Sequence, residues 1–341
     1  MQHVAIDLGG RESQVCVRAT EGQILLERKL PTASLKKFLQ QQPHSRIVLE
    51  TCAEAFRVAD FALSYKHEVR VVPATLVRSL GVGARRIKTD RRDAQVLSEV
   101  SCRIDLPSVH VPTDVARMRR SMCGMREELV SSRTALINCV RGWCRTRLLK
   151  LPAGTSRTLS ERIRETALKN ANGLPDYVER LLKTIDVLNE QIALADHELA
   201  QLAEDDPVCK RLMSVPGVGP VSSMRFAAAI DDISRFSTAH AVQSFLGLTP
   251  GENSSSEKKQ RTGITKAGPA PVRRALVQAA WNIRRFRPLD PISRWAAQIE
   301  QRRGKFVATV AVARKLAGIM FAVWRDGSVY EPNHRPRSQQ S

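Results

Sequence analysis

Val4-Ala5-Ile6-Asp7-Leu8-Gly9-Gly10 begins the chain with an apolar run that ends at a carboxylate and two glycines. The pattern predicts a buried strand with Asp7 at its carboxyl end, followed by a turn. A second run, Ile47-Val48-Leu49-Glu50-Thr51, predicts another buried strand that ends at Glu50. Functional side chains of α/β proteins gather at the carboxyl ends of such strands. Asp7 and Glu50 are therefore candidate site residues.

The sequence around these two runs predicts the rest of an α/β domain. Turns at Gly9-Gly10 and Glu21-Gly22 separate the first three strands. The expected strands cover 3–9, 13–19, 23–30, 46–51 and 68–72. The expected helices cover 33–41, 54–66, 75–83 and 90–102. Three strands followed by alternating helices and strands is the order of an RNase H-like domain.

Two further acids lie in Lys88-Thr89-Asp90-Arg91-Arg92-Asp93-Ala94, at the start of a predicted helix. Residues three apart share one helix face, so Asp90 and Asp93 are expected to point the same way. Mg²⁺ prefers oxygen ligands and binds through a few carboxylates, and paired ions serve phosphoryl transfer. Asp7, Glu50, Asp90 and Asp93 are therefore candidate Mg²⁺ ligands and catalytic residues. The structural alternative is that acids such as Asp90 cap their helices.

The chain is strongly basic. Its 341 residues include 54 Lys and Arg against 34 Asp and Glu, a formal net charge of +20. The last quarter, 251–341, has 18 basic and 6 acidic residues. A charge of this size favours nucleic acid as a partner. A ribosome-associated protein or a merely basic surface is the alternative.

Apolar residues at heptad a and d spacing run through long helices predicted between 113 and 205. The first series is Val115, Met118, Met122, Met125, Leu129, Ser132, Leu136 and Cys139. The second series is Val178, Leu181, Ile185, Leu188, Ile192, Ala195, Leu199 and Leu202. Such seams fit a bundle within one chain and a coiled coil between chains equally well.

Two short stretches mark the carboxyl-terminal region. Val215-Pro216-Gly217-Val218-Gly219-Pro220 joins two predicted helices, and its glycines fit either an ordinary turn or a turn that binds phosphate. Ser254-Ser255-Ser256-Glu257 precedes a group of basic residues. A serine run usually forms a polar loop. The functional alternative is a nucleophilic hydroxyl beside cations that neutralise a phosphate.

Size, cysteines and hydropathy restrict the remaining classes. A chain of 341 residues is expected to form two or three domains. The seven cysteines are scattered without a C-x-x-C pair, so we expect no disulfide framework, no zinc site and a reducing compartment. No apolar run approaches the roughly 20 residues of a membrane span. No signal-peptide pattern begins the chain, so we expect a cytoplasmic protein without a membrane anchor.

The motifs, taken in order, resemble one protein family. Ile6–Gly9, Val48–Thr51 and Lys88–Ala94 are similar to the RuvC-like domain of the DEDD transposases of bacterial insertion-sequence family one-ten, whose relatives include site-specific DNA invertases. Four further stretches resemble the second domain of that family, and they begin at Val215, Arg235, Ser254 and Ala313. The resemblance covers roughly residues 3–332.

This resemblance implies a recombinase that excises and inserts DNA through a circular intermediate. It implies that the four acids bind Mg²⁺ and that a serine of the second domain forms a covalent phosphoserine link to DNA. We expect Ser255 to be this nucleophile and Ser254 to be the next candidate, because Ser256 stands where the family commonly has glycine. The resemblance also implies a bridge RNA that pairs with donor and target DNA.

These observations together predict four segments. They are an α/β RNase H-like (RuvC-like) domain over 1–110, a helical coiled-coil region over 111–206, a mainly α transposase domain over 207–332 and a disordered tail over 333–341. Basic residues of the third segment are expected to contact phosphate: Lys258, Lys259, Arg261, Lys266, Arg273 and Arg274. The expected partners are DNA, a bridge RNA and further copies of the chain in a dimer or tetramer.

The main functional prediction is a bacterial DNA transposase or site-specific recombinase. One alternative is a RuvC-like, metal-dependent nuclease for DNA junctions, in which an activated water replaces the serine. The other is a nucleic-acid-binding scaffold without enzymatic activity, whose acids only cap helices.

Overall fold

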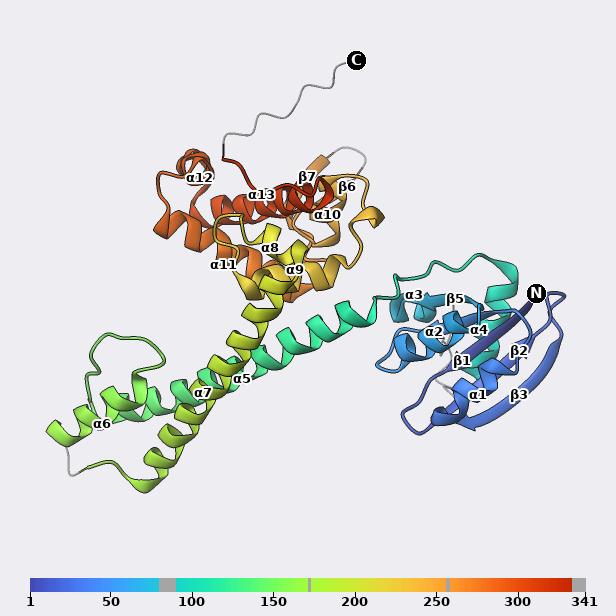
Figure 1. Ribbon diagram of the computed structural model, residues 1–341, viewed down its shortest axis with the longest axis horizontal. Coiled ribbons are helices and arrows are strands. Elements are labelled where there is room, and N and C mark those ends of the chain that lie inside the picture. The colour runs from blue at the N-terminus through green and yellow to red at the C-terminus, as the bar shows by residue number, and fades with distance from the viewer. Residues whose placement is uncertain (80–89, 171–172, 256–257, 333–341) are drawn as a thin grey trace, which may run out of the picture. The chain divides into compact units, whose positions relative to one another are not determined.

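The structure, a computed structural model, describes residues 1–79, 90–170, 173–255 and 258–332. It does not describe the side chains of 78, 79, 90, 170, 252–255 and 258–261, and the predicted tail at 333–341 lies outside the described residues. The chain divides into two compact units, unit 1 (Met1–Pro112) and unit 2 (Thr113–Ser341) (Figure 1).

Unit 1 contains a mixed five-stranded sheet in the order β3-β2-β1-β4-β5. The central strand β1 (Gln2–Asp7) pairs antiparallel with β2 (Glu12–Arg18) and parallel with β4 (Ser45–Glu50). The edges are β3 (Ile24–Pro31) and β5 (Glu68–Val72). The strands lie within one or two residues of the predicted ranges, and their arrangement is consistent with an RNase H-like domain.

Helices cover both faces of this sheet. Two helices, α1 (Leu35–Gln40) and α2 (Ala55–Ser64), pack against one face with a buried apolar cluster between. The opposite face is covered by α3 (Ala74–Ser79) and α4 (Asp90–Arg103). Both faces are buried, which explains why β1 and β4 are continuous apolar runs rather than alternating ones.

Unit 2 is mainly helical. The long helices α5 (Asp114–Thr146) and α7 (Asp176–Asp205) pack against each other. The remaining helices are α6 (Leu159–Asn170), α8 (Pro207–Leu212), α9 (Pro220–Ile230), α10 (Ala239–Phe245), α11 (Ala270–Phe286), α12 (Pro291–Arg303) and α13 (Lys305–Arg325). Short 3-10 helices cover Thr32–Ser34 in unit 1 and Ile233–Arg235 in unit 2.

The two predicted seams differ in outcome. On α7, the first residue of each predicted heptad is buried, namely Val178, Ile185, Ile192 and Leu199, and Leu182 and Ala203, which lie outside the predicted series, are buried as well. On α5 the prediction was only partly right, because Val115, Met118 and Met125 are 51%, 47% and 69% exposed. The buried side of α5 instead carries Ala116, Cys123, Ile137, Val140 and Cys144. A shift of one residue turns a helix face by about 100°.

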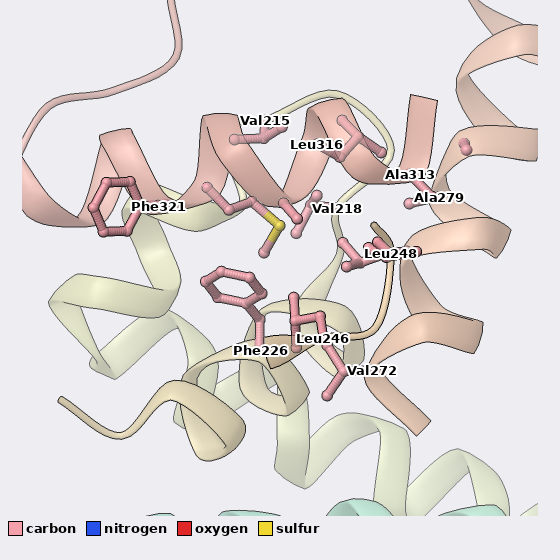
Figure 2. Packing of buried hydrophobic residues seen from close by; sticks show 14 of the residues in the cluster. Val215, Val218, Phe226, Leu246, Leu248, Val272, Ala279, Ala313, Leu316 and Phe321 are labelled. Carbon is pink, nitrogen blue, oxygen red and sulfur yellow. The ribbon is translucent and has the colours of Figure 1, made fainter. Parts of the chain in front are cut away.

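Helix α13 runs through the core of unit 2. Figure 2 shows Leu316 and Phe321 of α13 in the same apolar cluster as Phe226 and Val272. Contrary to the sequence expectation, this helix is long and apolar enough to cross a membrane by length and composition alone. Half of its most apolar window is buried inside the protein, so it has the character of a core helix.

All seven cysteines are free thiols, so no disulfide joins any of them. Four of them, Cys16, Cys123, Cys144 and Cys209, are buried. Burial raises the pKa of the Cys209 thiol to about 12, with the nearby Asp206 carboxylate adding to the shift. This thiol therefore stays protonated and acts as a small apolar residue.

Candidate active site

Asp7 and Glu50 lie side by side at the carboxyl ends of β1 and β4 in unit 1, and we call this end of the sheet the acid edge. Strands β1 and β4 are parallel, and Ile6 is opposite Leu49. The next residue on each strand is the acid, so the two carboxylates end neighbouring strands at the same level. Both residues are half-buried. The prediction that each acid ends a buried strand is therefore confirmed, and the role of the two acids as site residues stays a prediction.

Both acids point to the face that α4 covers. Side chains alternate between the two faces of a strand, so residues two apart share a face. Ala5 and Val48 belong to the apolar cluster beneath α4. Asp7 and Glu50 are two residues further along the same strands and therefore face α4 as well.

Helix α4 places Asp93 at the level of Asp7. Its Ser101 side chain is hydrogen bonded to His3 Nδ1 at 2.8 Å, near the start of β1, so the helix runs back along that strand. Asp93 is eight residues before Ser101, which corresponds to about 12 Å of helix. Asp7 is four residues after His3, which corresponds to about 13 Å of strand. Asp93 is only 7% exposed, on the helix side that faces the sheet.

The fourth acid, Asp90, begins α4 one turn before Asp93. Its side chain is outside the described part of the chain. The donors are all carboxylate oxygens, which suit a hard divalent cation such as Mg²⁺. Among the side chains that the structure describes, however, no three His, Cys, Asp or Glu residues are close enough to hold a metal ion. The carboxylates fit Mg²⁺ in chemistry, but the described acids Asp7, Glu50 and Asp93 do not lie close enough together in this structure to form a three-ligand group.

The turn after Asp7 is tightly packed. A Cβ atom at Gly9 would clash with the backbone carbonyl of Glu12. Thr32 Oγ1 donates a hydrogen bond of 2.6 Å to the carbonyl of Gly9 and is 2.8 Å from Ser13 Oγ. Glycine at position 9 therefore lets the chain turn sharply directly behind the acid.

The serine run lies in a β-hairpin of unit 2, a structure that the sequence did not predict. The hairpin consists of β6 (Pro250–Ser255) and β7 (Lys258–Ile264), with Ser255 opposite Lys258 and Ser254 opposite Lys259. Ser256 and Glu257, between the strands, lie outside the described residues. The predicted nucleophile is thus the last described residue of β6, and a lysine is its cross-strand neighbour.

Close backbone contacts hold the base of this hairpin. Gly247 and Gly268 both have positive φ, and a Cβ on either would clash with the backbone of the other side. Arg273 Nη1 donates hydrogen bonds to the carbonyls of Leu246, Ala267 and Gly268 at 3.1, 2.6 and 3.0 Å. Arg273, predicted to contact phosphate, therefore has a structural role at the hairpin base.

Arg274 also has a protein partner. Its Nη2 donates a 2.7 Å hydrogen bond to Glu127 of α5, and Glu127 pairs in turn with the buried Arg225 of α9. Burial alone would raise the pKa of Glu127, but the guanidinium groups of Arg274 and Arg225 hold it below its usual range. Lys266, another predicted phosphate contact, is exposed. The side chains of Lys258, Lys259 and Arg261 lie outside the described part.

The glycine-rich turn at 215–220 is packed into the core. Val215 and Val218 are 1% and 6% exposed, and Figure 2 shows both within the apolar cluster. Gly217 has φ +76°, and a Cβ there would lie 2.7 Å from the carbonyl oxygen of Ala279. Packing alone therefore accounts for this glycine, and phosphate contact at the turn stays a prediction.

Comparison with known proteins supplies the family. A family model described as "Transposase IS116/IS110/IS902 family" matches residues 209–293. A second, for the DEDD transposases of the IS110 type, matches residues 4–145 and so includes all four acids. The chain belongs to the IS110/IS116 family of transposases. The resemblance on which the sequence prediction rested is confirmed.

Relatives match over nearly the full length of this transposase. The transposase for insertion sequence element IS1111A of Coxiella burnetii is 28% identical, over 94% of this chain and 88% of its own. A probable family 20 transposase of Pseudomonas aeruginosa is also 28% identical, over 97% and 99%. A pilin gene-inverting protein of Moraxella bovis is 24% identical, over 81% and 78%. DNA transposase or recombinase activity, predicted from the sequence, is therefore supported.

Proposed function

We propose that this transposase recombines DNA strands with two groups of residues, Mg²⁺-binding acids in unit 1 and a serine nucleophile in unit 2. The observation that carries the proposal is the placement of Asp7 and Glu50 side by side on the face covered by α4, with Asp93 at the same level. When bound, Mg²⁺ supplies polarisation of a scissile phosphate. Asp7, Glu50, Asp90 and Asp93 would hold it.

Ser255 is the proposed nucleophile. Its Oγ gives up its proton and forms a phosphoserine bond to phosphorus, while the bond from phosphorus to the 3′ oxygen breaks and that oxygen takes up a proton and leaves as a hydroxyl, so protons balance. In the reverse direction a 3′ hydroxyl attacks the same phosphorus and releases the serine. A serine is a weak nucleophile unless a base, a metal or cations activate it. Lys258, across the hairpin from Ser255, supports this assignment.

A suicide DNA substrate tests the serine. We expect a protein–DNA adduct that resists denaturant, is lost in Ser255→Ala and is retained in Ser256→Ala. An adduct that survives Ser255→Ala and disappears in Ser254→Ala would move the assignment by one residue. Normal strand cleavage with no adduct in the unmodified protein would refute the proposal and favour the junction nuclease.

We further propose that a bridge RNA guides recombination in the bacterial cytoplasm. The support is the family of the chain together with its net charge of +20. Purified protein is then expected to require added RNA, transcribed from DNA beside the gene, to recombine a donor with a target. Recombination that proceeds equally well after ribonuclease treatment would contradict this part of the proposal.

The protein is also proposed to act as a dimer or tetramer. Val187 and Leu194 are seven residues apart on α7 and are 54% and 57% exposed, so this side of the helix is available to a second copy. Leu194→Asp is expected to reduce the mass measured by light scattering, and Lys183→Asp, at an exposed polar site of the same helix, is the control. An unchanged mass for Leu194→Asp would exclude α7 as the contact.

A further inference from the structure

Two aromatic rings meet at the surface where α11 ends and α13 begins. Trp281 of α11 and Phe306 of α13 are arranged edge to face, with ring centroids 6.3 Å apart and an interplanar angle of 81°. Phe306 is 77% exposed, although it belongs to one of the most apolar helices of the protein. Figure 1 shows α11, α12 and α13 grouped in unit 2. An exposed phenylalanine of this kind is not explained by core packing.

Cations surround these rings. Lys305 Nζ lies 4.9 Å from the centroid of the Trp281 ring, and the Arg284 guanidinium lies 5.5 Å from it. Arg284 is held in place, because it donates hydrogen bonds to the Lys305 carbonyl at 3.1 Å and to Thr309 Oγ1 at 2.6 Å and pairs with Glu300. The Trp281 ring therefore lies close to one guanidinium that is held in place and to one exposed ammonium group.

Further exposed cations neighbour Phe306 along the chain. Gly304, with φ +84°, joins α12 directly to α13, so Arg302 and Arg303 immediately precede it and Lys305 follows. All three cations are exposed. At the end of α11, Arg285 stacks on Phe286 at 5.3 Å, and that ring is 70% exposed. The first turn of α13 has no acidic residue.

Two simpler explanations account for only part of this surface. Arg285, Arg302 and Arg303 lie in the last turns of helices, where cations stabilise the helix dipole. That effect does not require exposed aromatic rings. Exposed apolar side chains often mark a protein contact, but a protein covering this surface would have to desolvate several cations, at a cost. Rings with cations between them suit a ligand that has flat faces and negative charge.

We propose that this aromatic and basic surface, formed by Trp281, Phe306 and Lys305 with the exposed Arg302 and Arg303 that precede Lys305 in the chain, binds unpaired DNA by stacking its bases. Bases of a single strand expose their flat faces to aromatic side chains, while cations neutralise the phosphates. Duplex DNA buries those faces within its own stack. The proposal rests on DNA as the substrate of the proposed function, since strand exchange supplies unpaired DNA, and it is independent of the identity of the nucleophile.

Equilibrium binding of labelled oligothymidine to the full-length protein tests the proposal. Loss of one stacked base weakens single-strand binding by about 5- to 100-fold in other proteins, so this loss of affinity is expected for Phe306→Ala. Phe306→Tyr, which keeps a ring, is expected to retain affinity. Leu289→Ala is the matched control, because Leu289 is 84% exposed and apolar but has no ring. The affinity for a duplex of the same length is expected to stay unchanged in all three variants.

Several results would overturn the proposal. Equal losses in Phe306→Ala and Leu289→Ala would mean that apolar contact, not stacking, is measured. A loss of duplex binding as large as that of single-strand binding would remove the preference for unpaired DNA. Tighter binding of oligouridine than of oligothymidine, with the same dependence on Phe306, would assign the surface to RNA. Ser255→Ala is expected to bind oligothymidine normally while forming no adduct, which separates this proposal from that of the nucleophile.

Discussion

The acid edge of unit 1 and the serine hairpin of unit 2 are positioned in opposite ways. Asp7 and Glu50 end two strands whose preceding residues, Ile6 and Leu49, are completely buried. Ser255 ends a strand of a two-stranded sheet whose base is held by Arg273 and by close backbone contacts at Gly247 and Gly268. The acids thus take their position from a packed core, whereas the contacts described for the hairpin are hydrogen bonds and close backbone contacts at its base. The acid edge should therefore tolerate changes nearby better than the hairpin does.

The largest effect is expected at the acid edge itself. Asp7→Asn removes one charge of the proposed metal site, and recombination is expected to fall by about 100-fold or more, since metal ions contribute several kcal/mol to such reactions. Thermal unfolding should change little. Glu12→Gln is the control, because Glu12 is an exposed carboxylate of the same sheet that pairs with Lys29. Undiminished recombination by Asp7→Asn would refute the metal site.

The hairpin is expected to respond to a change at its base. Arg273→Ala removes hydrogen bonds to three carbonyls, which should lower the free energy of unfolding by about 1–3 kcal/mol and reduce adduct formation by the folded protein. Denaturant titration and adduct yield provide the two measurements. Gln278→Ala, at an exposed site of the same helix, is the control. Normal adduct yield in Arg273→Ala would show that the hairpin keeps its position without this contact.

A smaller effect is expected at the turn behind Asp7. Gly9→Ala introduces a Cβ that clashes with the Glu12 carbonyl, and displacement of the turn should cost about 0.5–3 kcal/mol of stability together with some activity. Gly10→Ala is a close control, because a Cβ there would lie 3.9 Å from the nearest atom. If both variants behave alike in thermal unfolding and recombination, the close packing at Gly9 is not needed to position Asp7.

The smallest effect concerns acid stability in unit 2. The pKa of Glu127 is held below its usual range, so its carboxylate stabilises the fold above pH ~4.3, and this contribution is lost as the pH falls through the lower folded value. Glu127→Gln is expected to lower the free energy of unfolding by about 1 kcal/mol at neutral pH and to flatten its decline in acid. Glu128→Gln, at the exposed neighbour, should keep the decline.

The sequence predicted the structure well where a residue pattern has one physical explanation, and less well where it has several. An apolar run that ends at an acid has few explanations other than a buried strand, so β1 and β4 were predicted to within one or two residues, with their acids at the strand ends. The seam of α5 was misplaced, because apolar residues followed two neighbouring helix faces and only packing partners decide between them. At Gly217 the sequence left a packed turn and a phosphate-binding turn both open, and the close approach of α11 accounts for the glycine by packing.

The serine hairpin was missed for another reason. Its strands consist of glycine and polar or charged residues, apart from Pro250 and Ile264, so no apolar alternation signals them. Arg273 shows a similar limit on the prediction of phosphate contacts from charged residues. A guanidinium near a serine run suggests phosphate, but three carbonyls brought together by the fold bind the same donors. The sequence alone contains no sign of those carbonyls.

The place of α13 in the chain has a genetic consequence. Nine buried side chains of unit 2 come from this helix, which begins only at residue 305 of 341. A nonsense mutation or frameshift between codons 93 and 305 would leave the acids of unit 1 encoded while removing the centre of the core around the serine hairpin. Damaged gene copies of this kind would yield no working recombinase, however late in the reading frame the lesion falls before codon 305.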